Sequence, residues 1–328
     1  MSLRTAVIGV GHLGKQHARI HAALAQEGLC EFVGVCDIDA ARGNEIAHQY
    51  SGSAYRDWRA LIGNVEAVSL AVPTESHAEI ACGLLEAGCH VLVEKPIART
   101  VSEADAMIAS ARKGNAVLQV GHAERFNPAM IALRPHVRNP VYFEIHRVGQ
   151  FTARSLDIDV VLDLMIHDLD IVQWLVGEEV AVTDVSAVGI PILTNRVDAA
   201  NARIEFATGA VANITASRVG TERIRKMRFF QPRDYVVLDY ANNYASISNL
   251  SPPTNTPWPG VRTQVLEIKD VEPLRAEIES FVEAATNQTP PIVSGEDGRR
   301  ALLLALKTLA QIHEHTLRIG AAAQSHDV

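Results

Sequence analysis

The first 121 residues alternate between short apolar runs and stretches with helical spacing. RTAVIGV is too short for a helix and rich in Val and Ile, and CEFVGVCD, AVSLAV, HVLVEK and AVLQVG repeat the theme. Between these runs lie helical stretches such as HLGKQHARIHAALAQEG and SEADAMIASARKG. Short apolar strands that alternate with helices of about 10–15 residues are typical of βαβ units in a parallel sheet covered on both faces. Because such crossovers are right-handed, the pattern predicts a doubly wound α/β sheet of the Rossmann type.

The pattern changes after Gly121. VYFEIHRVGQF interleaves polar and apolar residues, ARIEFATGAVANITAS places two strands around a Thr-Gly turn, and MRFFQPRDYVVLDYANNYASISNL repeats the arrangement. These segments predict a second, α+β domain over residues 122–295, with a large, mostly antiparallel open sheet and a helix over Leu162–Val176. The tail at about 296–320 is strongly helical, and we expect it to pack back on the first domain, residues 1–121.

Composition narrows the class of protein. At 328 residues and 48% hydrophobic content, the chain is long enough for two packed domains. A net charge of −8 and an isoelectric point near 5.9 argue against a nucleic-acid partner, which requires clustered positive charge. We expect no membrane partner, because the sequence contains no apolar run of the roughly 20 residues that span a bilayer. With four cysteines, no C-x-x-C spacing and no leader-like segment, we expect a cytoplasmic protein.

A glycine pattern follows the first apolar run, in AVIGVGHLGKQHARIH at residues 6–21. Gly9 allows a sharp turn, Gly11 lets a pyrophosphate approach the backbone, and Gly14 lets the helix pack close to the strand. Asp37 ends the second strand, where an acidic residue binds a ribose diol. The pattern therefore predicts a dinucleotide site. NAD is favoured over NADP because Asp37 would repel a 2′-phosphate, although Arg42 lies close enough in sequence to leave NADP open.

Histidines near this loop raise the question of a metal. His17 and His21 share a helix face, but no further ligand lies nearby in the sequence. We therefore expect no metal site, and we interpret His12 as a phosphate-loop residue.

Two further motifs carry side chains that can take part in acid–base chemistry. HVLVEKPIA places Lys95 at the end of a strand, and DVVLDLMIHDLDIVQWL places Asp163 and His167 four residues apart, on one face of a predicted helix. A neutral imidazole can take the proton of a hydroxyl near neutral pH. A lysine ammonium can stabilise the alkoxide that forms, and a carboxylate can orient the imidazole.

The glycine loop, the E-K-P motif, VPTESH at residues 72–77 and the D-x-x-x-H motif together resemble the glucose–fructose oxidoreductase / inositol dehydrogenase / MocA (Gfo/Idh/MocA) family. The resemblance implies an NAD(P)-dependent enzyme that acts on a sugar or cyclitol hydroxyl. It also implies a Rossmann domain, a substrate domain on an open sheet, and homodimers or homotetramers joined through those sheets. By this match Lys95 lies near the nicotinamide and the reacting hydroxyl, His167 is the acid/base, and Asp163 contacts the substrate or orients His167.

Three longer stretches are similar to those of particular family members. GVGHLGKQHARI, VGHAERFNPA and RSLDIDVVLDLMIHDLDI look like the members that oxidise UDP-N-acetylglucosamine at carbon 3 to a 3-keto sugar, on the way to a diamino sugar for lipid A. We therefore expect a sugar-nucleotide substrate. A free-sugar or cyclitol dehydrogenase and a non-catalytic dinucleotide-binding regulator are the alternatives.

Loop and motif matches complete the expected site. The family's loop against the cofactor corresponds to Pro73, Thr74 and His77, with Thr74 where Asn often stands. The residues expected to contact the cofactor are Gly9, Gly11, His12, Leu13, Gly14, Asp37, Pro73, Thr74, His77, Glu94, Lys95 and Arg125. The residues expected to contact the substrate are Lys95, Asn127, Arg154, Asp163 and His167.

Some of these assignments have plain structural alternatives. Arg125 and Asn127 could belong to a helix cap, with Pro128 at the first helical position. Arg154 could be an ordinary loop residue. Three aspartates around the second motif are interpreted as caps or a solvated helix face: Asp159, Asp168 and Asp170.

Overall fold

The computed structural model describes residues 2–151, 158–251 and 260–324. The chain divides into two compact units, and each is described separately. Unit 1 comprises Met1–Phe126 and Glu272–Leu302, and unit 2 comprises Asn127–Val271 and Leu303–Val328.

Unit 1 is built on a parallel sheet that has six strands within the described residues, in the order β3-β2-β1-β4-β5-β6. The strands are β1 (Arg4–Ile8), β2 (Glu31–Cys36), β3 (Ser53–Tyr55), β4 (Ala67–Leu70), β5 (His90–Glu94) and β6 (Leu118–Gly121). This order is that of the Rossmann fold, so the predicted doubly wound sheet is confirmed. Of these strands only β3 was not predicted, because its three residues, SAY, are too few to show a repeating pattern of apolar and polar residues.

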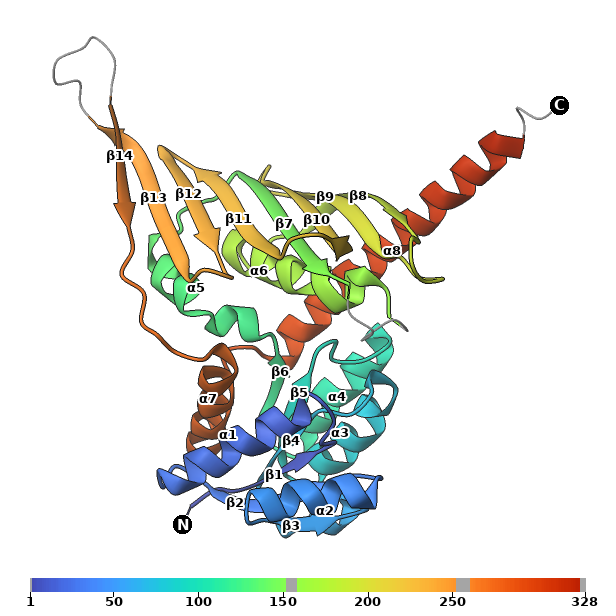
Figure 1. Cartoon of the computed structure of the whole chain (residues 1–328), viewed down its shortest axis with the longest axis vertical. Coiled ribbons are helices and arrows are strands. Elements are labelled where there is room, and N and C mark those ends of the chain that lie inside the picture. Colours follow the sequence, from blue (N-terminus) through green and yellow to red (C-terminus); the bar gives the residue numbers. More distant parts are fainter. Residues whose placement is uncertain (1, 152–157, 252–259, 325–328) are drawn as a thin grey trace. The chain divides into compact units, whose positions relative to one another are not determined.

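Helices cover both faces of this sheet (Figure 1). They are α1 (Gly14–Gln26), α2 (Ala40–Gln49), α3 (His77–Glu86), α4 (Val101–Lys113) and α7 (Pro273–Asn287). Helices α1, α2 and α7 lie on one face, while α3 packs against α4 on the other. The α1–α7 side buries an apolar core that includes Ile20, Leu92 and Phe281. Helix α7 was not predicted, and it joins unit 1 from a distant part of the chain.

Strands β1 and β4 are neighbours, although β2 and β3 separate them in the chain. The direction of winding therefore reverses between them. In doubly wound sheets the crevice outside the carboxyl ends of the strands at this reversal is where ligands bind. The glycine loop follows β1, so the fold brings it to that crevice.

Unit 2 is built on a second sheet, which within the described segments has eight strands in the order β14-β13-β12-β11-β7-β10-β9-β8. They are β7 (Tyr142–Gln150), β8 (Val182–Ile190), β9 (Ala199–Phe206), β10 (Val211–Gly220), β11 (Ile224–Gln231), β12 (Asp234–Asp239), β13 (Tyr244–Ser251) and β14 (Gly260–Val265). Strands β7 and β10 pair in parallel, and the other pairs are antiparallel. The mostly antiparallel sheet is thus confirmed. The β9–β10 hairpin turns at Gly209, whose φ of +84° suits glycine.

Helices α5 (Pro128–Leu133) and α6 (Ile166–Val176) lie against one face of this sheet (Figure 1). The predicted helix over Leu162–Val176 is confirmed. Its beginning differs from the prediction, because Val161–Met165 forms a π-helical turn rather than an α-helical one. The predicted C-terminal helix is observed as α8 (Gly295–Gln324). None of the helices in the described residues is both long and apolar enough to cross a membrane.

The interpretation of Asp168 and Asp170 as helix caps or a solvated face was wrong. Both side chains are buried. Asp168 forms a bidentate ion pair with Arg147 of β7, at 2.7 and 2.8 Å. The sequence pattern suggested a solvated face because charged residues usually face water. It gives no sign that Arg147, 21 residues away, pairs with the Asp168 carboxylate inside the protein.

Candidate active site

The three glycines after β1 differ in what surrounds them. Gly9 has a φ of +80°, and a Cβ there would lie 2.7 Å from the carbonyl oxygen of Ala71. A Cβ on Gly14 would lie 1.7 Å from the carbonyl oxygen of Gly9, so this glycine permits the close packing of α1. A Cβ on Gly11 would meet no atom within 4 Å. The space over Gly11 is therefore open, as the approach of a phosphate to the backbone requires.

A cavity of about 620 Å³ opens at this loop, within unit 1. Its floor is formed by the ends of β1, β2 and β4, including Gly9, Gly11 and Asp37. Its outer wall is formed by Arg42 and by residues 56–59. The volume lies in the range of small-molecule sites, and the residues fit the nucleotide part of a dinucleotide.

Asp37 is the buried acidic group of this cavity. Its Oδ2 accepts hydrogen bonds from the Val10 amide at 2.8 Å and from Arg42 Nε at 3.1 Å. Its Oδ1 accepts from the Asp39 amide and from Arg42 Nη2, both at 2.8 Å. Burial alone would raise the pKa of Asp37, but these hydrogen bonds outweigh it and lower the pKa, so the carboxylate is ionised.

Glu94 precedes Lys95 and is also buried. Its Oε1 lies 2.9 Å from Nε2 of His17 on α1, and its Oε2 accepts from the Lys95 amide at 3.2 Å. Burial raises the pKa of Glu94, whereas the bond to His17 and the charge of Lys95 lower it, with a net lowering. The carboxylate thus holds the backbone amide of Lys95. His17 is buried in the core.

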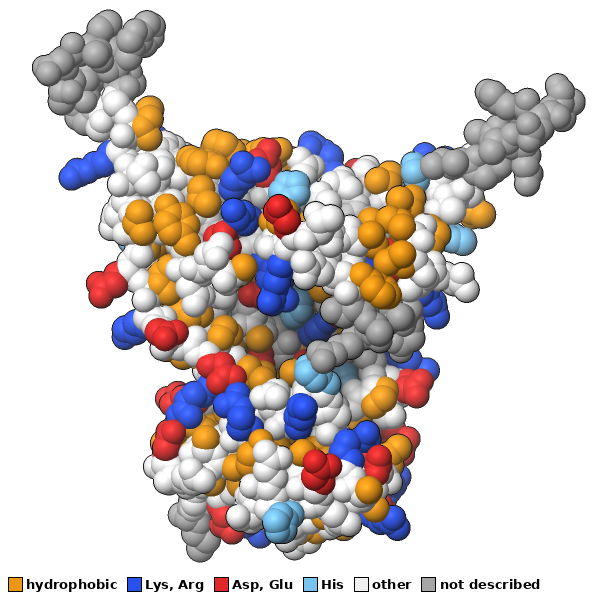
Figure 2. Space-filling model, viewed as in Figure 1, with side chains coloured by type: hydrophobic (Ala, Val, Ile, Leu, Met, Phe, Trp, Pro, Cys, Tyr) orange, Lys and Arg blue, Asp and Glu red, His pale blue; other side chains and the backbone are white. Residues whose placement is uncertain are grey.

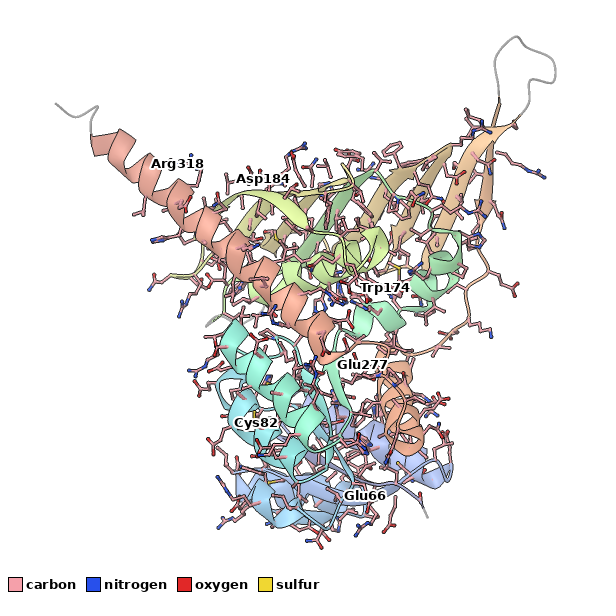
Figure 3. The ribbon with its side chains drawn as sticks, turned by 180° about the vertical axis from the view of Figure 1, so that it is seen from behind. Glu66, Cys82, Trp174, Asp184, Glu277 and Arg318 are labelled. Atoms are coloured by element: carbon pink, nitrogen blue, oxygen red, sulfur yellow. The ribbon has the colours of Figure 1, made fainter. Side chains whose placement is uncertain are left out.

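Glu277 of α7 lies beside this pair and is labelled in Figure 3. Its side chain is fully buried, and neither carboxyl oxygen has a hydrogen-bond partner among the described residues. Burial first, and then the charge of Glu94, raise the pKa of Glu277 well above its usual value. The carboxyl of Glu277 therefore keeps its proton to higher pH than an ordinary glutamate does. No periodicity in the sequence indicated it, since α7 itself was not predicted.

The loop after β4 holds Pro73, Thr74 and His77. Pro73 lines the cavity. His77 is buried, with Nε2 3.0 Å from the carbonyl oxygen of Val72 and Nδ1 3.1 Å from that of Pro96. Burial lowers its pKa. The imidazole therefore ties the VPTESH loop to the E-K-P segment, and a contact of Thr74 or His77 with the cofactor stays a prediction.

Arg125 and Asn127 follow β6. Arg125 is buried and its Nη2 lies 3.1 Å from Oδ1 of Asp297, near the start of α8. The Asn127 side chain accepts a hydrogen bond from the Ala129 amide at 3.0 Å, so it caps α5 with Pro128 at the first position. The capping alternative is thus observed for Asn127. Contacts of either residue with a ligand stay predictions.

The remaining expected groups belong to unit 2. Asp163 lies in the π-helical turn and His167 in the first turn of α6, and both are partly buried. Lys95 belongs to unit 1, so the meeting of Lys95 and His167 at one substrate stays a prediction. Arg154 lies outside the described residues. Within the described ranges, no group of three or more His, Cys, Asp and Glu side chains is arranged to hold a metal ion.

Comparison with known families assigns both parts of the chain. Residues 3–122 match the model for an oxidoreductase family with an NAD-binding Rossmann fold, and residues 102–230 match the Gfo/Idh/MocA C-terminal domain. A curated relative, the UDP-N-acetylglucosamine 3-dehydrogenase of Acidithiobacillus ferrooxidans, is 41% identical over 93% of this chain and 96% of its own. The chain belongs to the Gfo/Idh/MocA oxidoreductase family. It is therefore an oxidoreductase that uses a nicotinamide dinucleotide.

Solved structures and a more distant relative agree with this assignment. A crystal form of the Acidithiobacillus ferrooxidans enzyme superposes with a TM-score of 0.88 at 39% identity, covering 95% of this chain and 98% of that one. A levoglucosan dehydrogenase bound to NADH and levoglucosan, at 20% identity, shares the fold with a TM-score of 0.83 over 96% and 98% of the chains. The myo-inositol 2-dehydrogenase of Thermotoga maritima is 28% identical over 95% of this chain and 97% of its own.

Sequence reasoning missed several residues around the cavity. Arg56, Trp58 and Arg59 form its outer wall, and Arg59 stacks over Trp58 with its guanidinium carbon 4.4 Å from the ring centre. They follow the three-residue β3, so no recognisable strand end marked them. A longer β3 would have indicated that these residues lie beside Asp37.

Proposed function

We propose that this chain is an NAD-dependent dehydrogenase that oxidises a secondary hydroxyl of a UDP-sugar. UDP-N-acetylglucosamine, oxidised at carbon 3 to the 3-keto sugar, is the proposed substrate. The observation that carries this proposal is the 41% identity over 93% of the chain to an enzyme of that name. The cavity at the carboxyl ends of β1, β2 and β4, with Asp37 at its floor, supports the cofactor assignment.

The proposed chemistry assigns a role to each reacting side chain. His167 removes the proton of the sugar hydroxyl, and Asp163, four residues earlier, orients the imidazole. The Lys95 ammonium stabilises negative charge on the hydroxyl oxygen as the proton leaves. Glu94 and His17 fix the backbone that carries Lys95. The nicotinamide, when bound, accepts the hydride.

A substrate panel tests this proposal. Purified protein is mixed with NAD⁺ and, separately, with UDP-N-acetylglucosamine, UDP-glucuronate, myo-inositol and free sugars. We expect NADH absorbance to grow with UDP-N-acetylglucosamine and not with the free sugars. The product, examined by mass spectrometry, should be lighter than the substrate by two hydrogen atoms.

Other outcomes of this panel would support one of the two alternative functions instead. NADH formation with myo-inositol or free sugars alone would identify a cyclitol or free-sugar dehydrogenase, to which the relationship at 28% identity points. Tight binding of NADH without turnover of any compound would identify a regulator. The presence of both Lys95 and His167 favours an enzyme, since a sensor has no need for both.

We propose that the protein forms a homodimer or homotetramer through the open face of the eight-stranded sheet. This face carries exposed apolar side chains, including Phe230 (44% exposed), Leu250 (62%) and Val261 (71%). The Phe230 ring stacks there on Tyr142 and contacts Tyr235 at a tilt. Figure 2 shows apolar side chains among charged ones over this sheet.

The oligomer proposal is tested by the mass of the protein in solution. Phe230→Asp should lower the mass measured by sedimentation, because it places a charge in the interface. Ile62→Asp in unit 1, also at an exposed apolar residue, should not. An unchanged mass in Phe230→Asp would reject this face. A cytoplasmic location and a role in the route to lipid A stay predictions.

A further inference from the structure

One buried carboxylate organises the loop between β8 and β9, residues 191–198. The Asp198 side chain is fully buried. Its Oδ2 accepts hydrogen bonds from the backbone amides of Ile192, Leu193 and Thr194, at 2.7, 2.6 and 2.8 Å. Burial alone would raise the pKa of Asp198, but these amides outweigh it and lower the pKa to about 2. The carboxylate is therefore ionised at neutral pH, and its charge holds the loop in one conformation.

The same loop binds the segment that leads into the π-helical turn of unit 2. The Val197 amide donates to Oδ1 of Asp159 at 2.9 Å. The Val197 carbonyl oxygen accepts from the Val160 amide at 2.8 Å. The Asp159 side chain is thus bound by a loop 38 residues further along the chain, and the interpretation of it as a helix cap or part of a solvated face was wrong.

Arg218 of β10 holds the same segment from the sheet. Its Nε lies 3.6 Å from Oδ1 of Asp198, and its Nη2 donates to the carbonyl oxygen of Ile158. Both charged side chains of this pair are buried. Removing one partner of a buried pair leaves the other charge uncompensated, so each restricts where the other can lie. Residues 158–160 are therefore bound both by the loop and by the sheet.

This segment forms the beginning of the helix that carries the proposed reacting groups. The Asp159 carbonyl oxygen accepts from the amides of Leu162 and Asp163, both at 3.0 Å. Asp163 belongs to the π-helical turn Val161–Met165, and His167 follows in the first turn of α6. Such turns are rare and occur frequently at functional sites. Because the hydrogen bonds run without a break from residues 158–160 into this turn, a shift of the segment would displace Asp163 and His167.

We propose that Asp198 and Arg218 are positioning residues for the proposed acid/base, His167. They act through residues 158–160, which they hold against the sheet, and they do not take part in the proposed proton transfer. A displacement of about 1 Å at a reacting group can lower a rate about 100-fold, so such a support has a measurable effect on turnover. The inference rests on the proposed dehydrogenase function and adds to it two residues that the motifs did not indicate.

Steady-state kinetics with the sugar nucleotide and NAD⁺ test this inference. Asp198→Ala and Arg218→Met should each lower kcat by at least about tenfold. The dissociation constant of NAD⁺, measured by calorimetry, should change by less than about twofold, because the proposed cofactor cavity lies in unit 1. Circular dichroism should first show that every variant is folded, so that a lower kcat is not caused by loss of folded protein.

Variants of Asp159 distinguish positioning from a general effect on stability. Asp159→Ala removes the acceptor of the Val197 amide and should lower kcat as Asp198→Ala does. Asp159→Asn keeps a carbonyl oxygen at that place and should restore most of the activity. Because both alanine variants release the same contact, the double variant should lose about as much kcat as the more severe single one, and not the product of the two losses.

Asp184→Ala is the matched control. Asp184 is an exposed aspartate on β8, the strand that leads into the loop, and it is labelled in Figure 3. Its removal should leave kcat unchanged.

The outcomes separate this inference from the proposed function. A folded Asp198→Ala variant with the kcat of the parent protein would overturn the inference alone. So would a raised KM for the sugar nucleotide at unchanged kcat, which would make the loop a part of substrate binding. Losses that multiply in the double variant would also overturn it. A parent protein that turns over none of the compounds in the panel would overturn the proposed function, and the inference with it.

Discussion

Nε2 of His17 lies 2.9 Å from Oε1 of Glu94, the residue before Lys95, inside unit 1. The two residues are 77 positions apart, one on α1 after the glycine loop and one at the end of β5. The contact therefore links the cofactor loop to the E-K-P motif. Both motifs were recognisable in the sequence, but their connection was not.

His17→Ala should destabilise the protein and reduce turnover. The change leaves the buried Glu94 carboxylate without its imidazole, at a cost of about 1–3 kcal/mol or more in free energy of unfolding. Urea denaturation measures this loss. Arg19→Ala on the same helix, which removes an exposed pair with Glu272, is the control and should have little effect. Equal stability of His17→Ala and the parent protein would show that the contact contributes nothing.

Glu277→Gln should stabilise the protein at alkaline pH and not at acid pH. The raised pKa means that folded Glu277 keeps a proton that the unfolded chain loses above its ordinary pKa of 4.5. The free energy of unfolding therefore falls as pH rises from that value toward the pKa of the folded protein, by about 1.4 kcal/mol for each pH unit between the two. Gln has no proton to lose, so this variant lacks the decline.

The measurement is urea denaturation at pH 5 and at pH 8. The variant should exceed the parent at pH 8 and resemble it at pH 5. Glu279→Gln, at a half-exposed position on the same helix, should show no such dependence. A difference between Glu277→Gln and the parent that is independent of pH would contradict the raised pKa.

Gly11→Ala and Gly14→Ala should separate binding from folding. A Cβ at Gly11 meets nothing within 4 Å, so the stability should change by about 0.5 kcal/mol or less, while the dinucleotide binds at least about tenfold more weakly. A Cβ at Gly14 would collide with Gly9, which should cost about 3 kcal/mol or more. Thermal unfolding and calorimetry measure the two effects. Normal cofactor affinity in Gly11→Ala would place the phosphates elsewhere.

Lys95→Met should lower turnover by about 10²–10⁴-fold while leaving the dinucleotide bound. The reason is that, in the proposed chemistry, the ammonium acts on the forming alkoxide and not on the cofactor phosphates. Steady-state kinetics and calorimetry give the two quantities. Lys113→Met, which removes a surface lysine paired with Glu86, is the control. Full turnover in Lys95→Met would remove this residue from the proposed chemistry.

The parallel sheet was predictable because each of its strands is a short apolar run flanked by helices. Local patterns also predicted the sharp turn at Gly9 and the β9–β10 hairpin, and they gave the Asn127 cap as one of two alternatives. The sequence analysis missed two elements of unit 1. Strand β3 has only three residues, too few to show a repeating apolar pattern, and helix α7 follows a long segment that belongs to unit 2. Asp168 was misread for a related reason, since its partner Arg147 is distant in sequence.

The sequence by itself determined the family and the doubly wound parallel sheet, because both show in spacing over a few residues. Only the tertiary structure decided which polar groups share a low-dielectric interior. Desolvation and pairing act through space, so no spacing rule indicates that Arg42 saturates Asp37 or that Glu277 lies beside Glu94. These contacts lower the pKa of Asp37 and raise the pKa of Glu277.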